Sequence, residues 1–232
     1  MINFSFWEVV MLNLLVVIIL SYLVGSIPSA LLVSKAVKGI DIREHGSGNM
    51  GGSNVFRVIG WKYGVLVIVL DALKGALTVV LISRLYLGSF PFNNVTPFDD
   101  FTLVQIIAGL AAVVGHIWTA FAGFRGGKGI ATALGFLVTI ITVDMLLAMG
   151  IFLIVVYLSR YISLGSISAA VSVPLIMIVR ENIFNVDIQG YHTILPFSIA
   201  LAFLVMYTHR SNLKRLIAGS ENRISFSKKK SS

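Results

Sequence analysis

Two polar segments of this otherwise apolar chain have residue types suited to holding a phosphate. The first covers residues 41–57, is dense in Gly, Ser and Asn, and ends at Arg57. Successive backbone N–H groups in such a loop can form a nest for an anion, and arginine pairs well with phosphate oxygens. Residues 46–51 match GxGxxG, but no strand–helix–strand unit surrounds them, which excludes a dinucleotide-binding fold. An ordinary polar turn is the alternative.

The second segment covers residues 123–132 and contains Arg125, Lys128 and four glycines just before an apolar run. Free N–H groups at a helix start, flexible glycines and a lysine together predict a phosphate site. The segment is not a Walker A loop, because Ala122 occupies the place of the first glycine and Gly129 that of the Ser or Thr. Mg-nucleotide binding is therefore disfavoured, and a positively charged helix cap is the alternative.

Two further polar segments, residues 163–168 and 209–221, also interrupt the apolar chain. His209 and Asn212 are three residues apart and so share a helix face, which favours a working site over a simple cap. For Ser163 and Ser166, helix capping is the default interpretation. Asp71 and Lys74 lie inside an apolar run, where an unpaired charge costs about 2.5–3.5 kcal/mol. A structural ion pair and a direct substrate contact are equally supported for them.

The composition indicates a lipid environment for the elements that position these segments. Of the 232 residues 57% are hydrophobic and 12% charged, and the mean hydropathy is +0.92, whereas soluble domains have about 25% charged residues. The chain has no cysteine, which excludes disulfides, a thiolate nucleophile and an acyl-cysteine intermediate. The net charge of +8 is distributed as in a membrane protein, and no nucleic-acid partner is expected.

We predict an all-α, polytopic integral membrane protein with about seven transmembrane helices, because a span needs about 20 apolar residues. The apolar runs are residues 7–33, 58–87, 102–122, 131–161, 166–180 and 194–209. Asp144 interrupts the 131–161 run, which predicts two short helices that turn near this residue. Six spans remain the alternative if that run is one helix.

The charges predict an N-terminus outside and a C-terminus inside. In the seven-helix layout, 15 of the 18 basic residues fall on the cytoplasmic side, as the positive-inside rule requires. All four polar segments then face the cytoplasm, which favours a surface active site. The first basic residue is Lys35, so no cleaved signal peptide is expected. We expect one domain over residues 1–232 with a short basic tail, residues 220–232, in which Lys228–Lys230 anchor to anionic lipid.

The motifs together resemble the bacterial acyl-phosphate:glycerol-3-phosphate acyltransferase family, often called PlsY. The resemblance extends from about residue 25 to residue 221, with every motif in order. Arg125 stands where the family more often has Lys, Thr119 where Pro is common, and Ser53 where Thr is usual. The matching motifs are GSIP at 25–28, DIRxxGSGNxGxxNxxR at 41–57, DxxKG at 71–75, GH at 115–116, GGKGxAT at 126–132, SLxS at 163–166 and HRxNxxRLxxGxE at 209–221.

The resemblance implies acyl transfer from acyl phosphate to the 1-position of glycerol 3-phosphate, giving lysophosphatidic acid and phosphate in the first step of phospholipid synthesis. It implies a bacterial cytoplasmic membrane, no cofactor, no metal, and the acyl-phosphate-producing enzyme as a possible partner. The catalytic residues it implies are Ser47, Arg57, Lys128, Ser166, His209 and Asn212. The substrate-binding residues it implies are Gly46, Gly48, Asn49, Asn54, Gly126, Gly127 and Glu221.

The identity of the base stays open between His209 and the substrate phosphate. None of His45, His116, His192 and His209 has an Asp five residues on, as an HxxxxD acyltransferase requires. Substrate assistance is favoured, because an acyl phosphate is already activated and proximity could suffice. A transporter of a phosphorylated solute is the rival class, but it should place its polar residues at the bilayer midplane. A membrane scaffold with a headgroup patch does not explain the ordered motifs.

Overall fold

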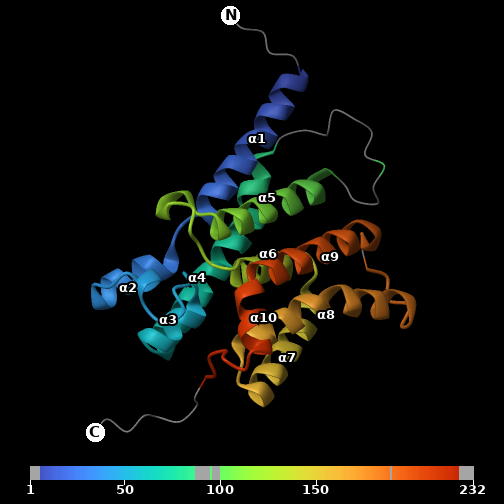
Figure 1. Ribbon diagram of the computed structural model, residues 1–232. Coiled ribbons are helices and arrows are strands. Elements are labelled where there is room, and N and C mark those ends of the chain that lie inside the picture. Colours follow the sequence, from blue (N-terminus) through green and yellow to red (C-terminus); the bar gives the residue numbers. More distant parts are fainter. Residues whose placement is uncertain (1–5, 87–94, 96–99, 189, 225–232) are drawn as a thin grey trace, which may run out of the picture. The chain divides into compact units, whose positions relative to one another are not determined.

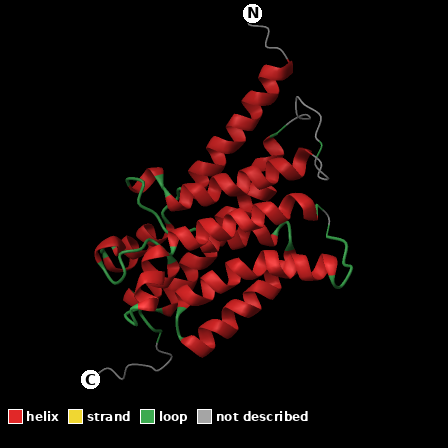
Figure 2. Cartoon of the chain, turned by 45° about the vertical axis from the view of Figure 1, so that its right-hand side comes forward, coloured by secondary structure: helices red, strands yellow, loops and turns green. Residues whose placement is uncertain are grey.

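The computed structural model describes residues 6–86, 95, 100–188 and 190–224, and every regular element in this part is a helix (Figures 1 and 2). Six helical segments there are long and apolar enough to cross a membrane. A helix satisfies its backbone hydrogen bonds internally, and a membrane span needs this because lipid offers no hydrogen-bonding partners. The predicted all-α, polytopic membrane fold is therefore confirmed. The Lys228–Lys230 anchor lies outside the described residues.

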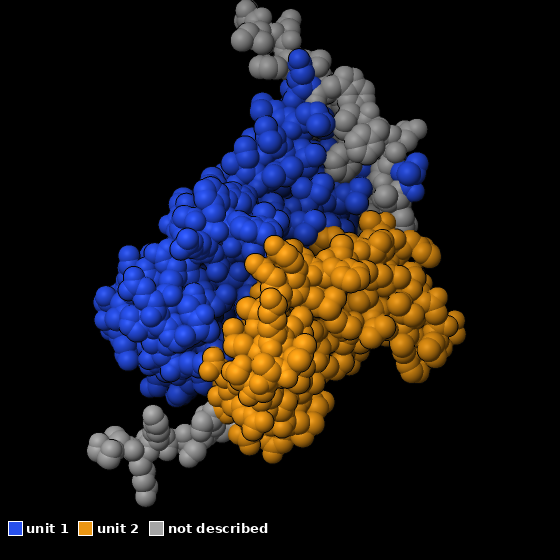
Figure 3. All heavy atoms as spheres, viewed as in Figure 1, with its two compact units in different colours: residues 1–142 blue, residues 143–232 orange. Residues whose placement is uncertain are grey.

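The chain forms two compact units, Met1–Thr142 and Val143–Ser232 (Figure 3). The single domain expected over residues 1–232 stays a prediction. The first unit contains six α-helices and three short 3₁₀ helices in its described residues. The α-helices are α1 (Phe6–Gly25), α2 (Ser29–Lys38), α3 (Gly52–Val58), α4 (Trp61–Val80), α5 (Asp100–Ile117) and α6 (Ile130–Val138). The 3₁₀ helices are η1 (Ile42–Glu44), η2 (Ile82–Leu85) and η3 (Ala120–Ala122).

Glycines allow the helices of the first unit to pack with their backbones in contact. Helix α1 packs on α5, and α4 packs on α6. A Cβ at Gly25 would lie 2.1 Å from the Ala112 carbonyl oxygen, and one at Gly75 would lie 2.1 Å from that of Thr132. Close approach at small residues is the usual way in which membrane helices associate. Helices α4, α5 and α6 therefore pack closely against one another, next to the polar loops.

The second unit contains α7 (Thr142–Ser159), α8 (Ile162–Asn182), α9 (Tyr191–Thr208) and α10 (Arg210–Ile217), with α8 and α10 both packed on α9. The Asp144 carboxylate, in the first turn of α7, pairs with the Arg180 guanidinium at 2.5 Å. This pair explains how a carboxylate can persist in a strongly apolar stretch, because pairing offsets the cost of burying the charge.

The helices differ from the sequence predictions in where some of them begin and end. The first predicted span ends at Gly25 rather than at residue 33, because Pro28 lacks an N–H group and cannot continue the helix. The 131–161 run does break in two, but the break lies at residues 139–141, just before Asp144. Helix α6 has nine residues, about 14 Å, and alone cannot cross a core of about 30 Å. Helix α3 lies in a segment that was expected to be a loop, whereas α10 is a separate helix where the end of the last span was expected.

Candidate active site

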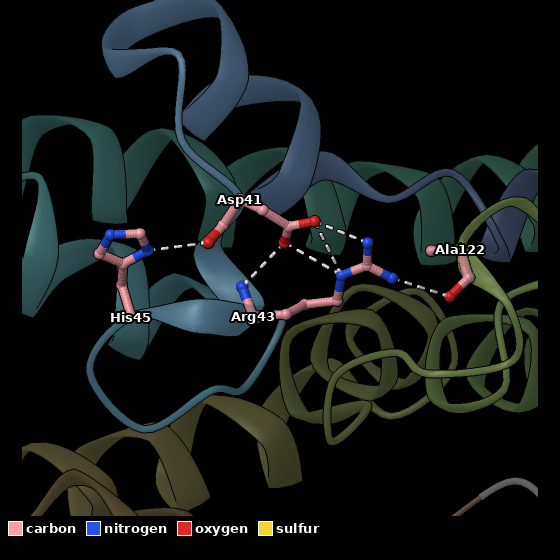
Figure 4. A network of polar contacts seen from close by, with 4 residues as sticks. All are labelled: Asp41, Arg43, His45 and Ala122. Atoms are coloured by element: carbon pink, nitrogen blue, oxygen red, sulfur yellow. Dashed lines mark hydrogen bonds and ion pairs between the residues drawn. The ribbon is translucent and has the colours of Figure 1, made fainter.

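The loop after α2 is fixed by an ion pair between Asp41 and Arg43 (Figure 4). Arg43 Nη2 lies 2.6 Å from Asp41 Oδ2, Arg43 Nε donates to Asp41 Oδ1 at 3.0 Å, and Arg43 Nη1 donates to the Ala122 carbonyl at 3.2 Å. The hydrogen bonds from Arg43 lower the pKa of Asp41 to about 2. Neither Asp41 nor Arg43 was among the predicted site residues, although an acid and an arginine two residues apart are a recognisable signal. Through Ala122, the pair ties the first polar loop to the second.

Asn54 holds the glycine-rich turn from inside the first loop. This buried residue of α3 accepts a hydrogen bond from the Ser47 N–H at 2.9 Å and donates to the His45 and Ile42 carbonyls. Gly46 and Gly48 have φ values of +62° and +70°, which favour glycine because other residues pay a steric cost there. Asn54 thus fixes the place of Ser47, and substrate binding by its amide stays a prediction.

The two glycines before Lys128 direct their N–H groups into the chain. Gly126 donates to the Ile117 carbonyl and Gly127 to the His116 carbonyl, both at 3.0 Å, and Gly48 likewise donates to the His45 carbonyl. Each of these three backbone N–H groups has a carbonyl partner in this structure. Substrate binding at Gly48, Gly126 and Gly127 stays a prediction. Their role is to let the loop pass close to the end of α5.

Gly127 is the point where the two polar loops meet. A Cβ at this position would lie 2.1 Å from His116 Nε2 and 2.8 Å from the Met50 carbonyl oxygen. Lys128 follows directly and is half-buried, and the half-buried Arg57 lies in the last turn of α3. The glycine-rich loop and the Lys128 loop therefore contact each other within the first unit.

A cavity of about 390 Å³ opens between these two loops. Charged side chains of both signs, two glycines and Met50 line it. The lining includes Gly48 and Gly126 of the predicted site, whereas neither Arg57 nor Lys128 is among the described residues that line the cavity. The lining residues are Asp41, Arg43, Glu44, Gly48, Met50, Arg125 and Gly126.

In the second unit, Glu221 organises the predicted residues of α8 and α10. Its buried carboxylate accepts hydrogen bonds from Asn212 Nδ2 at 2.7 Å, Ser163 Oγ at 3.0 Å and Arg215 Nε at 2.7 Å. Burial acts to raise the pKa of Glu221, but these three hydrogen bonds together lower it. The Glu221 oxygens thus hold side chains of its own unit, and substrate binding by Glu221 stays a prediction. Ser163 does not cap α8, which begins at Ile162.

His209, Asn212 and Ser166 are all buried in the second unit. His209 Nδ1 lies 2.9 Å from the Val205 carbonyl oxygen, which can only accept. The proton of the neutral ring is therefore assigned to Nδ1, which leaves the lone pair on Nε2. A histidine fixed in this tautomer can accept a proton or a hydrogen bond at Nε2.

Replacement of Glu221 by Gln should destabilise the second unit, because a charged acceptor of three hydrogen bonds is lost. We expect a loss of about 1.5–3 kcal/mol, seen as a lower melting temperature in detergent. Glu44→Gln, at an exposed carboxylate, is the matched control and should change little.

The pH dependence of this loss has a definite sign. Because the folded pKa of Glu221 lies below its ordinary value of 4.5, its contribution is complete above that value and is lost as the pH falls through the folded pKa. The difference between the wild type and Glu221→Gln should be equal at pH 8 and pH 6 and should shrink only below about pH 4. Shrinkage near pH 7 would contradict the assignment.

The part of the chain that the structure describes contains no group of three or more His, Cys, Asp or Glu residues placed to hold a metal ion. The predicted metal independence therefore stays a prediction, which a chelator tests.

Residues 15–219 match a protein family described as glycerol-3-phosphate acyltransferase. A glycerol-3-phosphate acyltransferase of Chlorobaculum tepidum is 45% identical, and the match covers 94% of this chain and 100% of the relative. One of Chlorobium chlorochromatii is 44% identical, with the same coverage of both chains.

Two crystal structures of PlsY, an integral membrane glycerol 3-phosphate acyltransferase, have a similar fold. The glycerol 3-phosphate form has a TM-score of 0.75 at 36% identity, covering 91% of this chain and 96% of that chain. The lysophosphatidic acid form has a TM-score of 0.74 at 37% identity, covering 91% and 95%.

Proposed function

Because the chain belongs to the glycerol-3-phosphate acyltransferase family, we propose that it acylates glycerol 3-phosphate with acyl phosphate as the donor. The acceptor 1-hydroxyl attacks the acyl carbonyl, an ester bond forms, and the bond from the acyl carbon to the phosphate oxygen breaks. The products are lysophosphatidic acid and inorganic phosphate, and the phosphate takes up the proton that the hydroxyl loses. The observation that carries the proposal is the meeting of two glycine-rich, basic loops at Gly127.

Arg57 and Lys128 are assigned to the phosphate charges of the substrates. Both are half-buried, and each lies in or next to a loop whose course is fixed by internal hydrogen bonds. Cations held in place in a water-poor site stabilise developing negative charge more than mobile ones do. Ser47 and Asn49, on the glycine-rich turn, are assigned to hydrogen bonding of the same groups. Gly46, Gly48, Gly126 and Gly127 set the shape of the two loops.

In the second unit, His209 and Asn212 are assigned to the acceptor, with Ser166 as a further contact. Glu221 acts through Asn212, whose amide it holds. We assign the proton of the acceptor hydroxyl to the leaving phosphate, because an acyl phosphate needs little further activation. His209→Ala with near-normal turnover at saturating substrates would exclude His209 as general base, whereas a loss of about 10²–10⁴-fold would favour it.

The active residues are assigned to the cytoplasmic face of a bacterial inner membrane, with the N-terminus outside. The excess of basic residues on one predicted side supports this orientation. An enzyme that makes acyl phosphate is the expected supplier of the donor. The transporter alternative loses support, because the mid-helix charges Asp71 and Lys74 pair with each other at 2.9 Å.

The donor is tested with purified protein in lipid nanodiscs, glycerol 3-phosphate, and one palmitoyl donor at a time: palmitoyl phosphate, palmitoyl-CoA or palmitoyl acyl carrier protein. We expect lysophosphatidic acid from palmitoyl phosphate only, at a rate that a chelator leaves unchanged. Equal rates from palmitoyl-CoA would contradict the donor assignment. No product from any donor would contradict the proposed reaction, and uptake of labelled glycerol 3-phosphate into liposomes would then support the transporter.

A further inference from the structure

A buried cluster of charged side chains takes no part in the proposed chemistry. Asp71 and Lys74 of α4 and His116 of α5 are 2%, 5% and 7% exposed. Asp71 Oδ1 lies 2.9 Å from Lys74 Nζ and 3.6 Å from His116 Nδ1. Burying an ion pair is costly, and replacing such a pair with apolar residues is often neutral or stabilising. Its presence therefore calls for a role beyond stability.

The cluster contacts the second polar loop through His116. The His116 carbonyl accepts the Gly127 N–H at 3.0 Å, and the ring lies so close to Gly127 that a Cβ there would be 2.1 Å from Nε2. The neighbouring Ile117 carbonyl accepts the Gly126 N–H at 3.0 Å. The two residues immediately before Lys128 are thus seated on the end of α5.

The other contacts of the cluster fix that end of α5 in turn. Lys74 Nζ donates to the Ile27 carbonyl at 3.0 Å, in the break between α1 and α2. At the same break, Ser26 Oγ donates to the Gly115 carbonyl at 3.2 Å, and Thr119 Oγ1 donates to the Ser26 carbonyl. On the far side of Lys128, α6 packs against Gly75 of α4. The Lys128 loop is therefore held by α5 before Lys128 and, through α6, by α4 after it. The cluster links α4 to α5.

We propose that Asp71, Lys74 and His116 are positioning residues for the acyl transfer: they hold the Gly126–Gly127 turn so that Lys128 stays in place to receive a substrate phosphate. The proposal rests on the proposed function in that it takes Lys128 to be a phosphate ligand. Asp71 orients the His116 ring, Lys74 fixes Asp71 to the Ile27 carbonyl, and the ring supports the turn. A displacement of a binding group by about 1 Å can lower a rate by about 100-fold, so the position of Lys128 has to be set precisely.

The test compares two variants that each remove a buried carboxylate from an ion pair, Asp71→Asn and Asp144→Asn. Asp144 is also 2% exposed and paired, but it belongs to α7 and not to the Lys128 loop. We expect Asp71→Asn to lower kcat/KM for glycerol 3-phosphate by about 10- to 100-fold, and Asp144→Asn to change it by less than about twofold. Equal effects of the two variants would overturn the proposal.

Double variants separate positioning from general stability. In the Lys128→Ala background, adding Asp71→Asn or His116→Asn should lower kcat/KM by less than about twofold, because the group they position is already absent. Full additivity would overturn the proposal. Two positioning variants are used so that one that fails to fold leaves the other, with folding checked by gel filtration and melting temperature.

Hydrogen exchange gives a readout that does not depend on activity. In Asp71→Asn the Gly126 and Gly127 amides should exchange at least about tenfold faster than in the wild type, because their seat on α5 loosens. Asp144→Asn should leave them unchanged. Unchanged exchange in Asp71→Asn would overturn the positioning network even if the wild type acylates as proposed. Faster exchange in Asp71→Asn, found together with a wild type that shows no turnover, would support the positioning network and contradict only the proposed function.

Discussion

Replacement of Lys128 by Ala should lower kcat/KM for acyl transfer by about 10²–10³-fold in lipid nanodiscs. Lys128 follows the turn at which the two polar loops meet, and it is half-buried there. A fixed ammonium at this place stabilises phosphate charge without reorganisation of water. Lys128→Arg should restore the activity only in part, because the guanidinium is larger and binds oxygens in a planar fork.

The matched control for this variant is Lys62→Ala. Lys62 is an exposed lysine in the first turn of α4, on the same predicted face of the membrane. It should keep at least about half of the wild-type activity, because exposed charges contribute little individually. Similar losses in both variants would show a general effect of positive charge near the membrane, and would contradict a specific site at Lys128.

Gly127→Ala should lower kcat/KM by about 100-fold while the protein still folds. The added methyl group would lie 2.1 Å from His116 Nε2 and 2.8 Å from the Met50 carbonyl oxygen, so the Lys128 loop must move away from both the His116 ring and the first loop, or these must give way. Gly127 is not among the glycines with positive φ, so the backbone tolerates alanine and the effect is one of contact alone.

Gly150→Ala is the control for that substitution. Gly150 lies within α7, and a Cβ there meets no heavy atom within 4 Å. Its kinetics should match the wild type, and its melting temperature should rise slightly, because alanine is the better helix former. Wild-type kinetics in Gly127→Ala would show that the two loops are not held in the contact described.

Much of the fold followed from local patterns in the sequence. Apolar runs of about 20 residues located the long helices, because lipid sets the length of a span directly. A break near Asp144 was expected because this charged residue interrupts the apolar run, and the break lies at residues 139–141. Proline at position 28 was visible but was not given enough weight, although it cannot donate the backbone hydrogen bond that a continuous helix needs.

The site was harder to predict, because its geometry depends on contacts between distant residues. A glycine-rich loop suggests N–H groups that face a ligand, but nothing in the spacing shows that Gly126 and Gly127 instead face carbonyls at the end of α5. Likewise, Glu221 accepts a hydrogen bond from Ser163, 58 residues earlier in the chain. The residue types indicated phosphate chemistry, whereas the contacts that hold the two loops in place could be seen only in three dimensions.

The most direct test of the proposed reaction follows both substrates at once, with palmitoyl [³²P]phosphate and [¹⁴C]glycerol 3-phosphate supplied to the purified enzyme in nanodiscs. The account predicts one ¹⁴C-labelled lysophosphatidic acid for each ³²P-labelled inorganic phosphate, no ³²P in the lipid product, and no phosphate release without the acceptor. Release of ³²P that does not depend on glycerol 3-phosphate, or formation of ¹⁴C-labelled lipid without phosphate release, would contradict acyl transfer from acyl phosphate.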